Sequence, residues 1–311
     1  MPEGHSVHRI ARQFQRNFVG SRVTVSSPQG RFAEGAARLD GRVITAAHAV
    51  GKQMFLEFDD GLWLRIHLGL YGAWDFAGEI VMDLPEASVL DAAGENSLRS
   101  IGAPRRARLR MSEDDRVTDA PVVFPADPVG QVRVRLLSDT VVADLRGPTA
   151  CEVLDPQQVE TAILRLGPDP ELDNSDAARD RFTNAVLRKP TPIARLLMDQ
   201  SVVSGIGNVY RAEMLFRARL NPHTPGKTLS LSAARELWAD WGFLLRTGIE
   251  TGQMMTRHDL VGPAIAKAMR NRADRHWVYK REGLPCRVCG THIVLEEMAA
   301  RKLYWCPQCQ A

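Results

Sequence analysis

The sequence predicts an α+β fold in three parts: an N-terminal helix with a β-sandwich domain, a helical domain, and a C-terminal cysteine-rich β-hairpin. Three observations predict it. Short apolar runs of strand length alternate with Gly, Asp and Pro from residue 22 to about residue 145, a spacing typical of a sandwich or barrel. From residue 156 the apolar positions recur at helical intervals. The last 35 residues hold four cysteines in two CxxC pairs.

The first expected element is one amphipathic helix over residues 5–18. Val7, Ile10, Phe14 and Phe18 share one face of this helix, and Gly20 stops it. The strands expected to follow it are 22–26, 42–47, 53–58, 62–67, 131–137 and 141–145.

Residues 83–128 break this rhythm because they are rich in Ala, Arg, Asp and Pro and have weak periodicity. We expect a long, partly disordered loop insertion there. The β-domain is expected over residues 2–150 and the helical domain over 151–275. The expected helices are 156–165, 176–187, 192–203, 208–217, 231–248 and 262–270.

The charge distribution indicates one class of partner. The net charge of the 311 residues is only +3, yet residues 180–311 hold 20 Lys and Arg against 11 Asp and Glu, a local net of +9. A basic C-terminal half is the footprint expected for a phosphate backbone. A merely solubilising surface stays open as the alternative.

The sequence predicts neither secretion nor a membrane span. Its first residues are polar and charged, which excludes a secretory signal peptide, and no run of 18 or more apolar residues occurs. Five cysteines in so long a chain do not make a disulfide scaffold. We therefore expect a cytoplasmic protein, with the lone Cys151 acting as a small buried hydrophobe.

The final module, residues 276–311, predicts one structural zinc ion. Cys286 and Cys289 form one CxxC pair, Cys306 and Cys309 form the other, and 16 residues separate the pairs. Two such pairs on tight turns are the four-thiolate zinc signature, which leaves no open coordination position for catalysis. The alternative, a redox CxxC, usually occurs once beside a βαβ pattern. Strands are expected at 292–296 and 302–305.

The first residues suggest an N-terminal nucleophile. After removal of Met1, Pro2 would carry a free secondary amine, whose pKa of about 7.7–8.0 leaves a useful fraction neutral at physiological pH. Glu3, beside it, could move protons. The alternative is an ordinary helix entry with Pro and Glu in its first turn, and the first residues alone do not reject it.

Five segments together resemble one protein family. MPEG (1–4), VGKQ (50–53), LGPDP (166–170), MDQSVVSGIGNVY (198–210) and RKLYWCPQCQ (301–310) are similar to segments of the Fpg/Nei family of bacterial DNA glycosylase/AP lyases. They stand in the family's order from the first residue to the last. The third to fifth resemble the interdomain segment, the helix–two-turn–helix motif and the zinc-finger ending.

The Nei (endonuclease VIII) branch fits better than Fpg. HLGLYG (67–72) resembles the Nei loop, whereas Fpg-type proteins usually place Met at the position of Leu70. The stretch 144–150 lacks the Arg-Phe pair of Fpg. The MPEGH opening is similar to an actinobacterial Nei subgroup. Ser6 and Gly69 depart from a family Glu and from a Gln of the best-known Nei loop.

The resemblance implies catalytic roles for four residues. Pro2 would attack the sugar C1′ and form a Schiff base, and Glu3 would move protons. Lys52 would contact phosphate and assist elimination. Arg301 would grip phosphates beside the lesion and assist the second, δ, elimination.

The resemblance also implies how DNA is held. Leu70 and Tyr71 would fill the void left by the flipped nucleotide. Gly207 and Asn208 would bind phosphate at a helix start, together with Arg301.

The implied protein is a bifunctional glycosylase/AP lyase of base excision repair. It would excise oxidised bases, pyrimidines favoured, and cut the strand by β,δ-elimination. The alternatives are an Fpg-like oxidised-purine enzyme and a non-catalytic damaged-DNA-binding protein. The expected cofactor is the single zinc ion. The expected partner is damaged duplex DNA, extending to single strands or bubbles, bound by a nucleoid-associated monomer.

Overall fold

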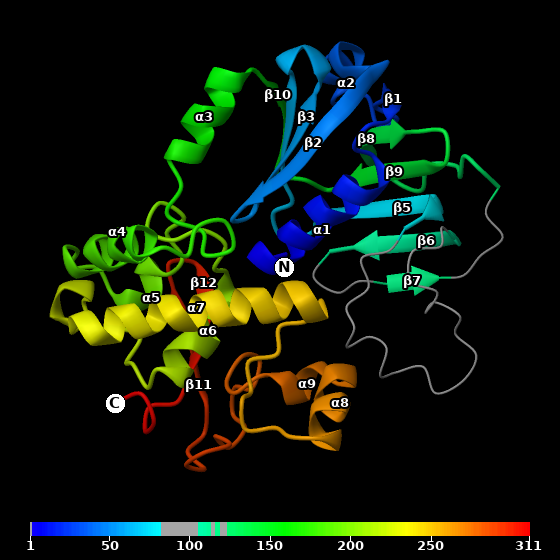
Figure 1. Ribbon diagram of the computed structural model, residues 1–311. Helices are drawn as coiled ribbons and strands as arrows, with labels where there is room; N and C mark the ends of the chain where they lie inside the picture. The colour runs from blue at the N-terminus through cyan, green and yellow to red at the C-terminus, as the bar shows by residue number, and fades with distance from the viewer. Residues whose placement is uncertain (1, 82–104, 113–115, 119–122) are drawn as a thin grey trace. The chain divides into compact units, whose positions relative to one another are not determined.

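A computed structural model describes residues 2–81, 105–112, 116–118 and 123–311 (Figure 1). By their contacts, the residues form two compact units, Met1–Arg165 and Leu166–Ala311. Among the described residues, no helix combines the length and apolar character needed to cross a membrane.

The first unit is an antiparallel sheet with helices. Its strands follow the order β10-β4-β3-β2-β1-β8-β9-β5-β6-β7. The elements in chain order are α1 (Gly4–Asn17), β1 (Arg22–Ser26), α2 (Ala33–Leu39), β2 (Arg42–Val50), β3 (Gln53–Phe58), η1 (Asp59–Gly61), β4 (Trp63–His67), β5 (Ala73–Ile80), β6 (Arg105–Met111), β7 (Arg116–Thr118), β8 (Val132–Leu137), β9 (Val141–Arg146), β10 (Ala150–Leu154) and α3 (Pro156–Leu164).

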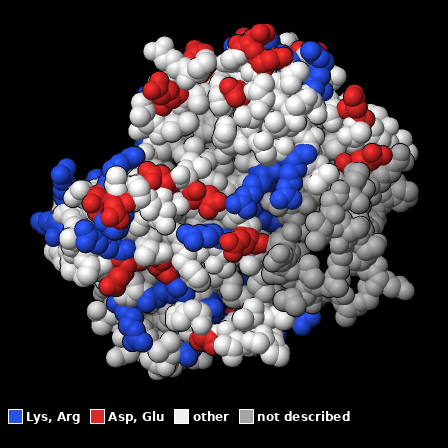
Figure 2. Space-filling model, viewed as in Figure 1, with Lys and Arg blue, Asp and Glu red and all other residues white. Residues whose placement is uncertain are grey.

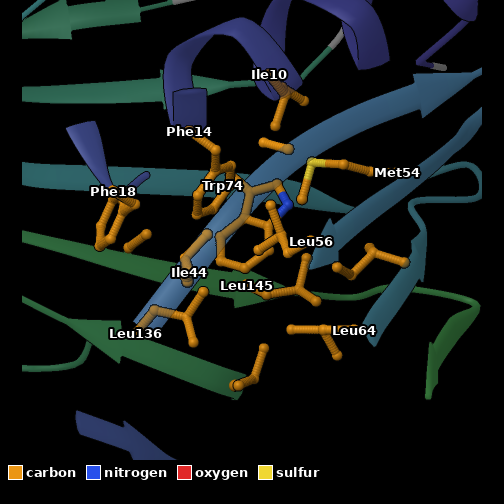
Figure 3. Packing of buried hydrophobic residues seen from close by; sticks show 14 of the residues in the cluster. Ile10, Phe14, Phe18, Ile44, Met54, Leu56, Leu64, Trp74, Leu136 and Leu145 are labelled. Atoms are coloured by element: carbon orange, nitrogen blue, oxygen red, sulfur yellow. The ribbon is translucent and has the colours of Figure 1, made fainter. Parts of the chain in front are cut away.

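Strand β1 joins the two layers of the predicted sandwich. Its first two residues pair with β2 and its last three with β8, so the sheet passes from one layer into the other through this strand (Figure 1). The core lies between the layers. Side chains of α1, of β2 to β4 and of the β5–β8–β9 layer converge on Trp74 (Figure 3). Phe14 of α1 meets the Trp74 ring edge-on at 4.7 Å.

The stretch expected to be a loop insertion contains two strands among its described residues. Strand β6 pairs with β5 along its whole length, from Trp74↔Met111 to Ile80↔Arg105, and β7 pairs with β6. Strand β6 was not predicted because its sequence is rich in arginine. The alternation typical of a strand is nevertheless present, since Leu109 and Met111 are buried with Arg110 between them. Residues 82–104, 113–115 and 119–122, which make up most of the expected insertion, lie outside the described residues.

The second unit consists of helices and a two-stranded hairpin. The elements are α4 (Asp176–Leu187), α5 (Ile193–Leu196), α6 (Asn208–Arg217), η4 (Gly226–Thr228), α7 (Leu231–Thr251), α8 (Pro263–Arg270), α9 (Arg272–Arg275), β11 (Val294–Met298) and β12 (Arg301–Trp305). Serine side chains cap α4 and α7 by accepting from the third helical amide. Helix α3, expected with these helices, belongs by its contacts to the first unit.

The helix expected over 192–203 is wrong beyond Leu196. Polar side chains hold the following residues in turns. The Asp199 carboxylate accepts from the amide and the hydroxyl of Ser201, and the Gln200 amide donates to the carbonyls of Met198 and Ile206. Such local bonds compete with helical backbone bonds, so the chain turns before α6 begins.

Candidate functional site

The predicted nucleophile stands at the start of α1. Pro2 and Glu3 are buried, and Glu3 is completely inaccessible. Glu3 is the N-cap residue, and its carbonyl accepts from the amides of Ser6 at 3.0 Å and Val7 at 3.4 Å. Its side chain makes no capping bond. The backbone of Glu3 therefore starts the helix while the carboxyl group takes no part in capping.

Three buried basic residues follow, which the sequence analysis did not single out. His5, His8 and Arg9 of α1 are all buried. Burial, then the Arg9 charge, the chain's amino terminus and His8 lower the pKa of His5 from 6.5 to about 3. The imidazole is therefore neutral at physiological pH and adds no positive charge beside the amino terminus. The sequence signal that could have identified the two histidines was their i, i+3 spacing, which places them on one face of a helix.

Lys52 lies in the two-residue turn between β2 and β3. Val50 pairs with Gln53, and Gly51 takes the left-handed conformation with φ +58°, which glycine adopts at little cost. Lys52 is half-buried. Burial and then the charges of Lys52 and Arg65 lower the pKa of His67, at the end of β4. The lysine turn and the end of β4 therefore form one electrostatic neighbourhood.

The loop after β4 carries the two predicted void-filling residues. Buried Leu68 anchors the loop, and the amide of Gly72 closes it on the Leu68 carbonyl at 3.0 Å. Leu70 is 40% exposed and Tyr71 is 85% exposed. An aromatic ring so exposed at a loop tip is available for insertion into a partner.

The departure at Gly69 has a local cause. Gly69 has φ +66°, and a Cβ atom there would lie 2.3 Å from Cγ2 of Thr149. The Thr149 hydroxyl lies 2.7 Å from Nδ1 of His67, and the Gly69 amide donates to the same nitrogen at 3.2 Å. Any larger residue at position 69 would have to displace Thr149 and adopt a strained backbone.

In the second unit, Gly207 is the N-cap of α6 and Asn208 is its first residue. Asn208 is only 7% exposed, and its Nδ2 donates to the carbonyl of Lys302 on β12 at 2.8 Å. Asn208 was expected to bind phosphate at a helix start. The structure shows that the same amide also holds the hairpin strand.

The turns before α6 are held by hydrogen bonds to the first residues of the second unit. Gly167 donates to the Gln200 carbonyl at 2.7 Å, and Ser204 bonds to the carbonyls of Gly167 and Pro168. A Cβ atom on Gly167 would lie 2.4 Å from the backbone of Val202. The close approach of two backbones explains the glycine at this position.

The four C-terminal cysteines form one cluster, as predicted. Their sulfur atoms all lie within 4.8 Å of one another, with Cys286–Cys309 at 3.9 Å and Cys289–Cys306 at 3.4 Å. Thiolates at about 2.3 Å around a tetrahedral zinc would lie about 3.8 Å apart, so the four sulfur atoms fit one zinc ion. Zinc bound there would cross-link the two turns.

Arg301 begins the second strand of the hairpin and is exposed. The two-residue turn before it, Ala299 and Ala300, has positive φ at both positions, as the favoured hairpin turn requires. Leu303 and Tyr304, which follow, are buried. The hairpin is therefore anchored by its second strand and presents Arg301 next to its turn.

A buried carboxylate ties α6 to the first residues of the zinc module. Glu213 is inaccessible and accepts from the backbone amides of Trp277, Val278 and Tyr279 at 2.7, 2.9 and 2.8 Å, and from the Thr256 hydroxyl. A buried charge is tolerated when it is this fully hydrogen-bonded. Glu213 thus fixes the module to the helix that starts with Asn208.

Lys and Arg side chains lie interspersed with Asp and Glu on the face drawn in Figure 2. Several arginines are paired, such as Arg217 with Asp240 at 2.6 Å and Arg179 with Asp176 at 2.7 Å. The positive charge on this face is therefore not uniform.

Three family models match successive parts of the chain. They are the formamidopyrimidine-DNA glycosylase N-terminal domain over residues 1–119, the formamidopyrimidine-DNA glycosylase H2TH domain over 166–259, and the zinc finger found in FPG and IleRS over 283–311. With the sandwich, the helix α6 and the four-cysteine hairpin, they define a zinc-finger DNA glycosylase.

Similar proteins include Endonuclease 8 1 of Mycobacterium tuberculosis (strain ATCC 25618 / H37Rv), which is 37% identical over 310 residues, covering 100% of both chains. Formamidopyrimidine-DNA glycosylase of Acidothermus cellulolyticus is 29% identical and covers 100% of this chain and 97% of its own. The Lactococcus lactis Fpg bound to abasic-site DNA shares the fold, with a TM-score of 0.71 at 20% identity and 99% coverage of both chains.

The chain belongs to the Fpg/Nei family of base-excision-repair DNA glycosylases with AP lyase activity. The predicted family, the α+β fold class and the structural zinc are confirmed. The solved relatives include the same Lactococcus enzyme with DNA containing an oxidised pyrimidine, at a TM-score of 0.72 and 20% identity.

Proposed function

We propose that the protein excises oxidised bases, pyrimidines favoured, and then cleaves the strand by β,δ-elimination through a Schiff base on Pro2. The observation that carries this proposal is the N-terminus of α1. Pro2 and Glu3 are buried together there, and the neighbouring His5 is held neutral.

The chemistry follows from the amine. With Met1 removed, neutral Pro2 attacks C1′ as the base leaves with the electron pair of the glycosidic bond, and the attacking nitrogen then loses its proton. The nitrogen lone pair next breaks the bond from C1′ to the sugar ring oxygen, and Glu3 donates a proton to that oxygen as the ring opens. A secondary amine can give only a cationic iminium, which accepts electrons when the C2′ proton departs. The 3′ phosphate then leaves in the β step and the 5′ phosphate in the δ step.

Lys52 is assigned to a phosphate contact and to proton transfer in the elimination. Its place in a tight turn, half-buried beside His67, supports this role. The same surroundings lower the pKa of His67 and so disfavour a charged imidazole beside Lys52.

Leu70 and Tyr71 are assigned to the space left in the duplex by the flipped nucleotide. Their exposure, on a loop whose base is closed by hydrogen bonds, supports insertion more than a core role. A loop of this kind need not read the base opposite the lesion. The proposed substrates therefore include single strands and bubbles.

Gly207, Asn208 and Arg301 are assigned to phosphates of the damaged strand. The first two stand at the start of α6, where backbone N–H groups and the helix dipole favour an anion. Arg301 is exposed on the zinc hairpin and is also assigned to the δ step. We propose that the protein acts as a monomer in the bacterial cytoplasm, in association with the nucleoid.

Borohydride trapping on an abasic oligonucleotide tests the mechanism. The mature protein should form a covalent complex, and Pro2→Gly or a retained N-terminal extension should reduce trapping severely. Cys151→Ser serves as the control, because it leaves the amine intact and Cys151 has no assigned role in the site. Undiminished trapping by the extended protein would move the nucleophile to a lysine and refute the mechanism.

Excision rates on matched duplexes test the substrate class. Thymine glycol should be removed faster than oxidised guanine, with little dependence on the opposite base. Faster removal of oxidised guanine, strictly opposite cytosine, would establish the Fpg-like alternative instead.

A further inference from the structure

Arg211 is a buried cation one helical turn after Asn208. It is 1% exposed and among the largest fully buried side chains of the described residues. Burying a guanidinium is costly unless its N–H groups are hydrogen-bonded. Its Nη2 donates to Oδ1 of Asn208 and, at 3.0 Å, to the carbonyl of Lys302.

These bonds fix the orientation of the Asn208 amide. Oδ1 accepts from Arg211, and Nδ2 directs one hydrogen to the Lys302 carbonyl at 2.8 Å. A side-chain amide nitrogen carries two hydrogens, so the second N–H can donate to a phosphate. Without Arg211, Oδ1 would lose this donor and the amide could turn over.

The same bonds fix the hairpin strand. Asn208 and Arg211 converge on the one carbonyl of Lys302, which directly follows Arg301 in β12. Hydrogen bonds thus join the start of α6 to the backbone next to Arg301, although the bonded residues are more than ninety positions apart in the chain.

We propose that Arg211 is a positioning residue that presents the Asn208 amide and the Arg301 guanidinium in one arrangement to the phosphates of one DNA strand. This inference rests on the proposed phosphate roles of Asn208 and Arg301. Arg211 itself is buried and acts through these two residues, while its charge, in the first turns of α6, further favours an anion at the helix start.

Two substitutions at Arg211 test the role. Arg211→Met keeps the length of the side chain and removes its donors, whereas Arg211→Lys keeps the charge with a single-point donor. Arg217→Met is the matched control, because Arg217 lies on the same helix and pairs with Asp240 instead. The thermal midpoint and the zinc content are measured for each variant. DNA affinity is then compared at a temperature at which all variants are folded.

Arg211→Met should weaken binding to a duplex with an abasic-site analogue about tenfold, as expected for losing a hydrogen bond to a charged group. The salt dependence should fall by about one phosphate contact. KM for the β step at an abasic site should rise with kcat retained, and Arg211→Lys should restore part of the loss. Adding Arg211→Met to Asn208→Ala should cost less than it costs in the wild type.

Wild-type affinity for a folded, zinc-loaded Arg211→Met, or fully additive effects with Asn208→Ala, would overturn the inference while leaving the phosphate roles intact. An equal loss of DNA affinity in Arg217→Met and Arg211→Met would show that the effect is general destabilisation, and this result would also overturn the inference. Wild-type affinity for both Asn208→Ala and Arg301→Ala would overturn the proposed phosphate roles themselves, and the inference with them.

Discussion

Lowering the pH should destabilise the first unit through His5. The imidazole is 1% exposed in α1, and its pKa falls from 6.5 to about 3 because of burial, the Arg9 charge, the amino terminus and His8. In the unfolded chain the imidazole is solvated and returns to its ordinary pKa. Between these two values the unfolded state binds more protons than the folded state, so stability decreases as the pH falls.

The magnitude follows from the two pKa values. The contribution of His5 is complete above the unfolded value of 6.5 and is lost progressively as the pH falls towards about 3. Each unit within this window corresponds to about 1.4 kcal/mol. Going from about pH 7.5 to about pH 5 should therefore cost about 2 kcal/mol through this one residue.

The assay is the free energy of unfolding in urea at both pH values, for wild type and for His5→Asn. The variant cannot titrate, so the pH-dependent loss should be smaller in it by about 2 kcal/mol. His48→Asn is the control, because His48 lies in the same unit on β2 but is exposed. An equal loss in wild type and His5→Asn, or an NMR titration of His5 near neutral pH, would refute the reasoning.

Three further predictions concern other parts of the molecule. Cys306→Ser should reduce zinc from about one ion per chain to near none and weaken DNA binding, whereas Cys151→Ser should keep both; metal analysis showing retained zinc would contradict this. Gly167→Ala should cost about 1–3 kcal/mol by overpacking against backbone, seen as a lower thermal midpoint. Gly242→Ala, whose Cβ would meet its nearest neighbour at 3.6 Å, should not show this loss. Tyr71→Ala should slow excision from duplexes but not from single strands, since only a duplex leaves a void; equal slowing on both substrates would remove Tyr71 from that role.

Local patterns in the sequence were enough to predict several elements. Helices α4 and α6 have the expected bounds, because capping residues and apolar periodicity are read within one segment. The four cysteines could be predicted equally well as zinc ligands, since their spacing alone defines the ligands. Strand β5 was missed because it is buried on both faces over most of its length, so it lacks the alternation that marks a half-buried strand.

The site was predictable only in part. Pro2, Lys52, Asn208 and Arg301 could be named from motifs, and their roles stay predictions until they are tested. The partners of Asn208 could not be named, because its bond to Lys302 joins residues that only the folded chain brings together. Arg211 looked like an ordinary helical arginine until its burial was known.

The carboxylate of Glu213 determines how the second unit opens. Its three successive amide partners, Trp277 to Tyr279, cannot separate from α6 without leaving a charge buried and unpaired, a loss of about 3–5 kcal/mol. Fraying of this segment alone is therefore disfavoured, and its amide hydrogens should exchange with solvent only in rare, large openings. The zinc module and α6 should then unfold as one cooperative unit, so that damage to the metal site reaches the helix that starts with Asn208.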